Sequence, residues 1–288
     1  MASVLITGTS KGIGLETALA FGRAGHTVFA TMREPSRAPE LAVRAAAERL
    51  PIFIYPMDVD SDSSVRNAID GLQRDHGAID ILVNNAGIER EGSIEELPFA
   101  DFHATMETNY FGALRCIQAV VPQMRRRRSG WIINVSSVAG RISQPPLAPY
   151  MASKWALEAL SESLACEMKM FEVHVAIVEP GIIDTAMARR ISLDGEPSLY
   201  PHRTRMAGRF TESLENPVSP SFVADKIVAI VTSGTWQLRH LVGPSAVPFI
   251  EWRQSMTDEQ WVDLHSADDE TYSRLMQADD EVPDKAAD

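Results

Sequence analysis

Short apolar runs rich in β-branched residues alternate with helical patterns from the first residues of the chain. The runs SVLIT, HTVFATM and PIFIYPM are followed by helical patterns at about 12–24, 39–50 and up to about residue 76. Parallel strands need crossover helices, so this alternation predicts a parallel sheet covered by helices on both faces.

The same alternation continues through the middle of the chain. It runs through IDILVNN, a long helix at about 99–127, GWIINVSS, a helix at about 150–171 and VHVAIVEP. A loop-rich insertion at 181–220 follows, and then SPSFVADKIVAIVTSG predicts a helix and RHLVG a last short strand. We therefore expect one doubly wound α/β domain of about seven strands over residues 1–244, with a lid at about 182–217.

The C-terminal extension, residues 245–288, has a different character. Thr257 and Ser266 are typical N-cap residues, with Gln260 and Asp269 three positions later, which predicts two short helices. Beyond Ala278 the sequence is acidic, and we expect it to be disordered.

The negative charge is concentrated in that extension. Residues 257–288 contain 11 acidic and 2 basic residues, a net charge of −9, which leaves −3 of the total −12 for the other 256 residues. A nearly neutral body argues against nucleic acid as a partner, and the run 125–128 is better explained as cations at a helix C-terminus.

The remaining composition favours a cytoplasmic protein. Cys116 and Cys166 are the only cysteines and both fall in predicted helices, where we expect small buried apolar residues rather than a disulfide. The N-terminus shows no basic leader, and no apolar run reaches the length of a membrane span. The seven histidines show no paired metal-ligand spacing, so no metal site is expected.

The segment TGTSKGIG between the first strand and the first helix predicts a phosphate-binding turn. Gly8, Gly12 and Gly14 permit a tight turn and let backbone N–H groups approach a pyrophosphate at the positive end of the helix dipole. The spacing differs from the standard Gly-x-Gly-x-x-Gly fingerprint, so the surrounding strand and helix support the assignment.

The end of the second strand bears on the choice of nicotinamide cofactor. An acid there would bind the free 2′-hydroxyl of NAD, but Glu34 follows Arg33, and Lys11 adds a second cation. Unless both cations are merely solvated surface charges, they favour NADP(H) over NAD(H).

Tyr150 and Lys154 lie four residues apart in APYMASKW, a spacing that puts a phenol and an ammonium on the same helix face. The fifth strand ends at Ser136 and Ser137, and at the carboxyl edge of the sheet either hydroxyl can face a substrate. Asn109 is unfavourable inside a helix unless its side chain has a partner. An ammonium beside the phenol predicts a lowered tyrosine pKa.

Together, TGTSKGIG, NNAG, Asn109, Ser137, YMASK and the Pro-Gly pair at 180–181 resemble the short-chain dehydrogenase/reductase family over roughly residues 3–243. The resemblance implies a Rossmann-like sheet and an active-site tetrad of Asn109, Ser137, Tyr150 and Lys154. In the family's pattern the serine stands thirteen positions before the tyrosine, which selects Ser137 rather than Ser136. The segment FATMR is similar to NADP-using members, such as hydroxysteroid and retinol dehydrogenases.

The resemblance also implies roles around the cofactor. It makes Asp58 the adenine contact, Thr185 the contact to the nicotinamide carboxamide, Lys154 the ribose contact, and Asn109 the anchor of a water that connects Lys154 to solvent. The full set of predicted cofactor-binding residues is Gly8, Ser10, Lys11, Gly12, Ile13, Gly14, Arg33, Asp58, Val59, Asn85, Ala86, Gly87, Tyr150, Lys154, Pro180, Gly181, Ile183 and Thr185.

These features predict an NADP(H)-dependent oxidoreductase acting on a carbonyl or secondary alcohol. In reduction, Tyr150 would donate a proton to the carbonyl oxygen while Ser137 hydrogen-bonds the same oxygen. The alternatives are a cofactor-binding sensor without turnover and an epimerase or dehydratase that recycles its cofactor.

The substrate and the assembly are predicted less directly. Apolar residues of the lid and of the loop after Ser137 suggest a bulky, mostly apolar substrate, although they could simply pack the lid onto the domain. They are Ile183, Met187, Ile191, Leu193, Tyr200, Met206 and Phe210 in the lid, and Val138, Ile142, Pro145, Pro146 and Leu147 in the loop. The resemblance implies a homodimer or homotetramer, paired through the helices that contain the two cysteines.

Overall fold

A computed structural model describes residues 1–193 and 197–280, and in it seven parallel strands form one sheet of order β3-β2-β1-β4-β5-β6-β7. The strands are β1 (Ser3–Thr7), β2 (Thr27–Met32), β3 (Ile52–Pro56), β4 (Ile81–Asn84), β5 (Gly130–Val135), β6 (Val173–Pro180) and β7 (Arg239–Val242). The predicted doubly wound α/β fold is confirmed. The order changes direction between β1 and β4, which is where open α/β sheets bind their ligands.

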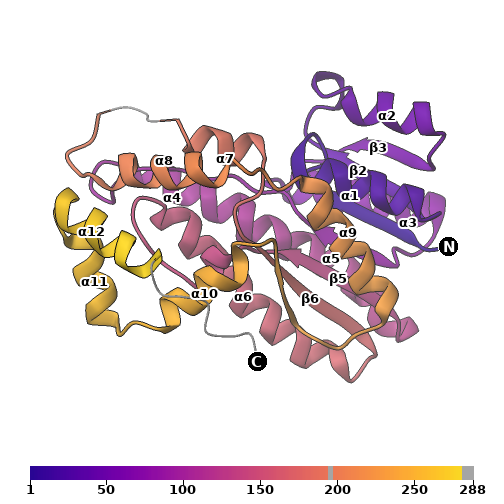
Figure 1. Ribbon diagram of the computed structural model, residues 1–288. Helices are drawn as coiled ribbons and strands as arrows, with labels where there is room; N and C mark the ends of the chain where they lie inside the picture. The colour runs from indigo at the N-terminus through magenta and orange to yellow at the C-terminus, as the bar shows by residue number, and fades with distance from the viewer. Residues whose placement is uncertain (194–196, 281–288) are drawn as a thin grey trace, which may run out of the picture.

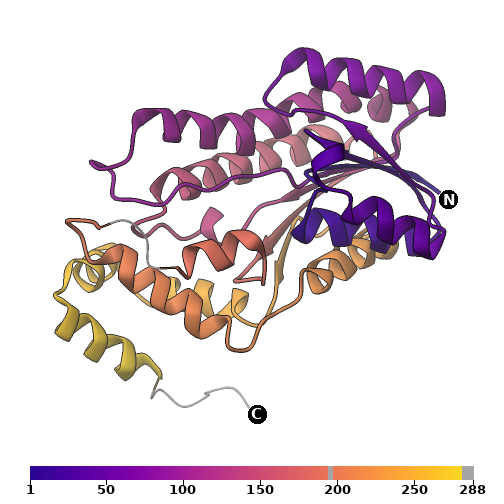
Figure 2. The same cartoon turned by 90° about the horizontal axis from the view of Figure 1, so that it is seen from above.

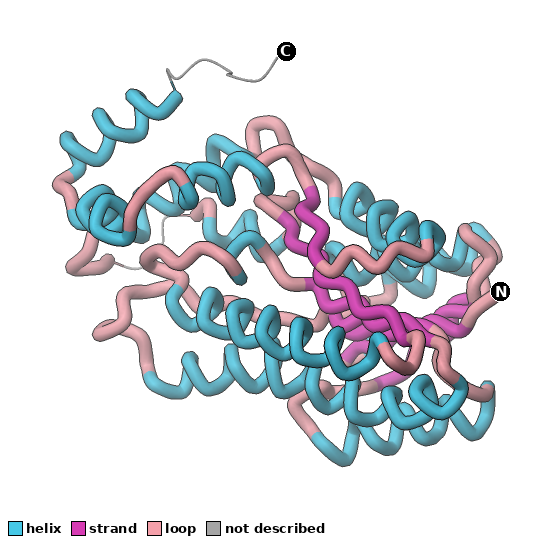
Figure 3. The backbone as a smooth tube through the Cα atoms, turned by 90° about the horizontal axis from the view of Figure 1, so that it is seen from below, coloured by secondary structure: helices cyan, strands magenta, loops and turns pink. Residues whose placement is uncertain are grey.

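Two layers of helices sandwich the sheet (Figures 1 and 2). One layer contains α1 (Gly12–Arg23), α2 (Glu40–Glu48) and α9 (Pro220–Ser233), and the other contains α3 (Asp62–His76), α5 (Gly112–Arg127) and α6 (Ala148–Lys169). On β1, Val4 and Ile6 pack toward the first layer and Leu5 toward the second, as alternation along a strand requires. Figure 3 shows the strands enclosed between these helices.

The long helix predicted at 99–127 contains a π-helical turn. It consists of α4 (Phe99–Met106), the π-helical turn η2 (Glu107–Phe111) and α5. Such turns often mark functional sites, and this one contains Asn109. The arginines at 125–127 lie in the last turn of α5, as predicted.

A chain of buried hydrogen bonds attaches α6 to the sheet. Asn84 Nδ2 donates to Asn134 Oδ1 at 2.8 Å, and Asn134 Nδ2 donates to Ser161 Oγ at 2.8 Å. All three side chains are at most 4% exposed, so these bonds are shielded from competing water. They connect β4, β5 and α6, and so fix the helix that contains Tyr150 and Lys154.

The segment after β6 contains more helix than the sequence indicated. The insertion predicted to be loop-rich includes α7 (Ala186–Ile191) and α8 (His202–Ser213), and α10 (Ala246–Gln254) precedes the two predicted tail helices, α11 (Asp258–Ser266) and α12 (Asp269–Asp280). Two short 3₁₀ turns, η1 (Pro35–Arg37) and η3 (Val138–Gly140), complete the elements of the described residues.

The two predicted N-caps have different outcomes. Thr257 forms a complete capping box with Gln260, as predicted. The prediction for Ser266 is wrong, because this residue ends α11, and the Asp268 carboxylate instead accepts the backbone N–H of Thr271 at 2.7 Å. The predicted disorder beyond Ala278 is wrong up to Asp280, which is helical, and otherwise lies outside the described residues.

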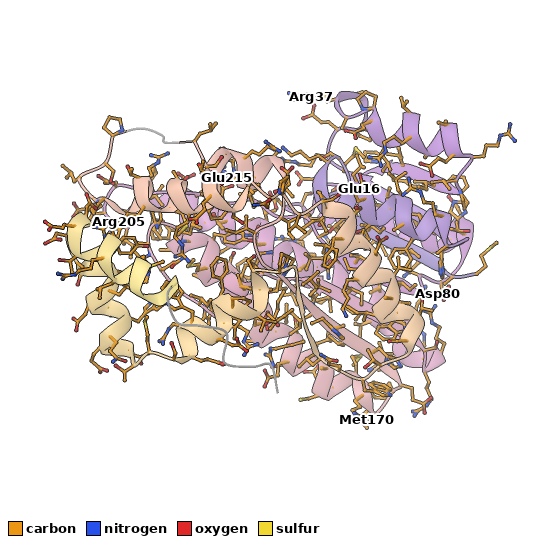
Figure 4. The ribbon with its side chains drawn as sticks, viewed as in Figure 1. Glu16, Arg37, Asp80, Met170, Arg205 and Glu215 are labelled. Atoms are coloured by element: carbon orange, nitrogen blue, oxygen red, sulfur yellow. The ribbon has the colours of Figure 1, made fainter. Side chains whose placement is uncertain are left out.

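The described part of the C-terminal extension is fastened to the lid and to the loop after β5. Arg205 of α8 pairs with Asp269 at 2.6 Å, at the place labelled in Figure 4, and Trp261 Nε1 donates to the Ser143 carbonyl at 2.8 Å. His202 Nε2 also lies 2.9 Å from the His265 carbonyl oxygen. The extension therefore forms part of the wall beside the lid.

The two cysteines lie in different environments. Cys116 is buried, as predicted, but Cys166 is exposed on α6, because its position on the helix faces away from the sheet. Within residues 1–193 and 197–280, no helix combines the length and apolar character needed to cross a membrane.

Two carboxylic acids are buried between β6 and α6. Glu179 is fully buried, and neither of its carboxyl oxygens has a hydrogen-bond partner among the described residues. Burial and the neighbouring Glu158 raise the pKa of Glu179 to about 7, although Arg141 and Arg239 act in the opposite direction. Glu158 is held by Arg239, whose Nε donates to Oε2 at 2.9 Å.

The raised pKa of Glu179 predicts a fall in stability with rising pH. Between its ordinary value of 4.5 and about 7, the folded chain keeps a proton that the unfolded chain has released. The free energy of unfolding should therefore fall by up to about 3 kcal/mol across that window. Glu179→Gln should remove this slope and be the more stable form at pH 8, as measured by urea unfolding from pH 4.5 to 8.

Glu167→Gln, an exposed change on α6, is the control and should retain the wild-type slope. Identical pH profiles for the wild type and Glu179→Gln would show that this carboxyl is ionised in the folded chain throughout the window.

Candidate active site

A cavity of about 560 Å³ lies at the carboxyl edge of the sheet, where the segments after β1, β2, β3, β4, β5 and β6 meet. All but two of the predicted site residues line it, and the exceptions are Gly14 and Asn109. Gly14 instead packs against the turn after β1. The contact is so close that a Cβ at this position would lie 2.4 Å from the Gly8 carbonyl oxygen.

The glycine turn forms one end of the cavity and has the geometry of a phosphate cradle. Gly8 and Gly12 have φ angles of +71° and +61°, which favour glycine. A Cβ on Gly8 would also lie 2.7 Å from the Ala86 Cα. The turn opens directly into α1, so its backbone N–H groups and the helix dipole can bind an anion.

The residues beside this turn fit a cofactor with an additional phosphate on its adenosine ribose. Arg33 and Lys11 line the cavity, are exposed, and form no hydrogen bond or ion pair with another described residue. Glu34, the nearby acid, is already paired with Arg37 at 3.1 Å. Asp60 also lines the cavity and interacts electrostatically with Arg33, but neither cation is held in an ion pair with a described carboxylate.

Hydrogen bonds join the segment after β4 to the end of β1. Asn85 Nδ2 donates to the carbonyl oxygens of Thr7 and Gly8 at 2.9 and 3.0 Å. The Thr7 hydroxyl in turn accepts the backbone N–H groups of Asn85 and Ala86, both at 3.0 Å. These bonds hold the backbone of Asn85, Ala86 and Gly87 at the cavity wall.

Ser137, Tyr150 and Lys154 meet near the middle of the cavity. Ser137 follows β5, and its hydroxyl faces the Pro180 carbonyl at 3.3 Å. Tyr150 lies in the first turn of α6, and Lys154 lies one turn later, with its Nζ 5.5 Å from the centre of the tyrosine ring. Lys154 Nζ donates to the Val135 carbonyl at 2.9 Å, which fixes the amine beneath the phenol.

Asn109 lies behind the wall of the cavity and has the partners that its mid-helix position required. Its Nδ2 donates to the Ile88 carbonyl at 2.9 Å and to Ser153 Oγ at 2.8 Å, while Oδ1 accepts the Ile88 N–H at 2.8 Å. Ser153 Oγ donates onward to the Tyr150 carbonyl at 2.6 Å. Asn109 thus connects the segment after β4 to the first turn of α6.

Burial has the largest effect on the pKa values of Tyr150 and Lys154. It raises the pKa of Tyr150 to about 12, against a hydrogen bond with Ser137 that lowers it. Burial also lowers the pKa of Lys154 to about 8, while Glu158 acts to raise it. The predicted lowering of the Tyr150 pKa is therefore wrong for the chain as described, because desolvation of the phenolate outweighs the hydrogen bond from Ser137. At neutral pH the phenol keeps its proton.

The other half of the cavity has mainly apolar walls, supplied by the lid and by the loop after β5. Met187, Ile191, Met206 and Phe210 contribute, as predicted, but Leu193 and Tyr200 are exposed and do not. Both residues lie between α7 and α8, outside the two lid helices that face the cavity.

Several residues of this half were missed from the sequence. They are Glu89 and Arg190, which form an ion pair, Gln144 and Arg209, which share a hydrogen bond, and Phe249 and Trp252 of α10. Arg209 directly precedes Phe210, which the sequence did single out, but Arg203 and Arg205 of the same helix give no reason to prefer it from the sequence. Phe249 and Trp252 gave no signal, because α10 was not predicted.

Comparisons with known proteins agree with this geometry. Residues 2–195 match the family model for short chain dehydrogenases. The chain is 34% identical to oxidoreductase BOA17 of Botryotinia fuckeliana over 91% of this chain and 97% of that protein. It is 35% identical to retinol dehydrogenase 8 of Bos taurus, over 86% of this chain and 83% of that protein.

A solved structure supports the same relationship over nearly the whole chain. A short-chain dehydrogenase from Streptomyces avermitilis superposes with a TM-score of 0.76 at 30% identity, covering 97% of this chain and 96% of that one. The chain therefore belongs to the short-chain dehydrogenase family of oxidoreductases, which transfer hydride with a nicotinamide cofactor.

Proposed function

We propose that this protein is an NADP(H)-dependent oxidoreductase that interconverts a carbonyl and a secondary alcohol on a bulky, mostly apolar substrate. The observation that carries the proposal is that Ser137, Tyr150 and Lys154 line the same cavity as the glycine turn. A proton donor and a cofactor cradle thus open into one space, as hydride transfer to a carbonyl requires.

In the reductive direction, the protonated Tyr150 hydroxyl gives its proton to the carbonyl oxygen of the substrate. Ser137 hydrogen-bonds the same oxygen and stabilises the negative charge that develops on it. When bound, the nicotinamide supplies the hydride. Asn109 acts as a positioning residue, because its bonds to Ile88 and Ser153 hold the turn that presents Tyr150.

The cofactor would lie along the carboxyl edge of the sheet. The glycine turn would hold its pyrophosphate, Asp58 its adenine, Lys154 its nicotinamide ribose and Thr185 its carboxamide, and all of these groups line the cavity. Arg33 and Lys11 favour NADP because both are free to bind a 2′-phosphate.

The apolar walls favour a bulky substrate, and the similarity to a retinol dehydrogenase is consistent with this preference. We keep two further predictions, a cytoplasmic location and a homodimer or homotetramer formed through α5 and α6. Sedimentation velocity at micromolar concentration tests the assembly, and a monomer alone would contradict it.

Tyr150→Phe should strongly reduce turnover while cofactor binding persists. Removal of the proton donor should lower kcat/KM by about 10²- to 10⁴-fold, since that is the usual contribution of general acid catalysis. The assay follows NADPH absorbance with a panel of ketones and aldehydes, with NADPH binding measured by fluorescence. Tyr55→Phe, which removes a hydroxyl that contacts His76 outside the cavity, is the control.

Two results of this assay would count against the proposal. If the Phe variant kept full activity, Tyr150 would not be the proton donor. NADPH binding without turnover of any carbonyl would instead favour a sensor or an enzyme that recycles its cofactor.

Arg33→Ala should weaken NADPH binding by about 10- to 100-fold and leave NADH binding within about twofold, because a charge-assisted phosphate contact is lost. Isothermal titration calorimetry with both cofactors measures this difference. Arg66→Ala, another exposed arginine outside the cavity, should change neither affinity. Equal losses for NADPH and NADH would show that Arg33 does not discriminate between them.

A further inference from the structure

The cavity continues from Tyr150 into a region whose walls are mainly apolar. Tyr150 itself packs on the edge of a cluster that joins the loop after β5, α6 and both lid helices. Its other members at the cavity wall include Leu147, Met151, Met187, Ile191, Met206 and Phe210. A substrate with its carbonyl at Tyr150 would therefore lay an apolar body along this cluster.

The charged side chains of this region are paired with one exception among the described residues. Glu89 is paired with Arg190, and Arg90 Nε lies 2.9 Å from Asp101. Arg209 also lines the cavity, yet it forms no ion pair with any carboxylate in residues 1–193 or 197–280. A half-buried guanidinium beside apolar walls keeps its positive charge without a counter-ion there.

The neighbours of Arg209 fix its orientation without neutralising it. Its guanidinium lies 5.2 Å from the ring centre of Phe249 and 4.9 Å from that of Trp252, both on α10. Nη1 donates to Gln144 Oε1 at 3.2 Å, and this is its only hydrogen bond to a described residue. A guanidinium has five N–H donors, so most of them remain available to a ligand in the cavity.

We propose that Arg209 forms a subsite for a carboxylate on the substrate, which would then be an amphipathic keto acid or hydroxy acid. The inference rests on the proposed function for the position of the reacting carbonyl. A planar guanidinium held over two rings is suited to bind a carboxylate through two parallel hydrogen bonds. The apolar cluster would bind the chain between the two ends, so the acid would be recognised at a distance from the carbonyl.

The C-terminal extension is part of this subsite. Phe249 and Trp252 orient the guanidinium, and His265 Nε2 lies 3.1 Å from the same Gln144 oxygen that Arg209 contacts. Contacts with the extension therefore help to fix the position of the Arg209 guanidinium in the cavity.

The test uses the full chain with NADPH and a series of ω-benzoylalkanoates with two to eight methylene groups. Each acid is compared with its methyl ester, which has the same ketone and no charge. At one or two chain lengths we expect kcat/KM for the acid to exceed that for the ester by about 10- to 100-fold. Arg209→Met should remove this preference by slowing the acid alone, and Arg209→Lys should keep part of it.

Arg205→Met is the matched control. Arg205 lies one turn earlier on α8, stacks 4.5 Å from the ring centre of Tyr272 and pairs with Asp269, but it does not line the cavity. This variant loosens the same lid and extension and should retain the preference for acids. The proposal is overturned if no acid is preferred at any length, if the preference survives in Arg209→Met, or if both methionine variants reduce it equally.

A binding experiment separates this inference from the proposed function. Calorimetry measures ω-phenylalkanoates and their methyl esters, which have no ketone, on the wild type and on Arg209→Met. Tighter binding of the acids that depends on Arg209 would support the subsite even if no ketone were reduced. Equal binding of acid and ester would overturn it even if ketone reduction were observed.

Discussion

The common direction of all seven strands is the constraint on which the rest of the structure depends. Parallel pairing brings the carboxyl end of every strand to the same edge of the sheet. The glycine turn after β1, the segment after β4 and Ser137 after β5 therefore become neighbours, although they are far apart in the sequence. Helices must then cover both faces, and their N-termini point back to this edge, where an anionic cofactor can bind.

The position of α6 brings Tyr150 and Lys154 to this edge of the sheet. One face of the helix contains Tyr150, Ser153, Lys154 and Ser161, and the buried bond from Asn134 to Ser161 holds that face against the sheet. The same burial that fixes these groups also shifts their pKa values, since it raises that of Tyr150 and lowers that of Lys154. Attachment of the helix and the chemistry of the site thus have a common physical origin.

The sequence predicted those parts of the molecule that local patterns encode. The parallel sheet of seven strands, the glycine turn and the tyrosine–lysine spacing follow from periodicity and from short-range geometry, and the structure places each of them as predicted. Two kinds of feature could not be predicted. The pKa of Tyr150 depends on burial by segments distant in sequence, and the lid helices depend on packing against an extension whose first helix, α10, lacks a distinct amphipathic pattern.

The cavity has two parts, one that contains the reacting groups and one that contacts the rest of the substrate. The reacting groups belong to the sheet edge and α6, whose geometry is fixed by hydrogen bonds to the backbone. The far wall belongs to α8 and α10, which contact each other mainly through side chains such as Arg209 and Trp252. Substitutions in that wall can change which substrate is bound without moving Tyr150 or Lys154. Specificity in this protein therefore resides in the segments that local sequence patterns describe least well.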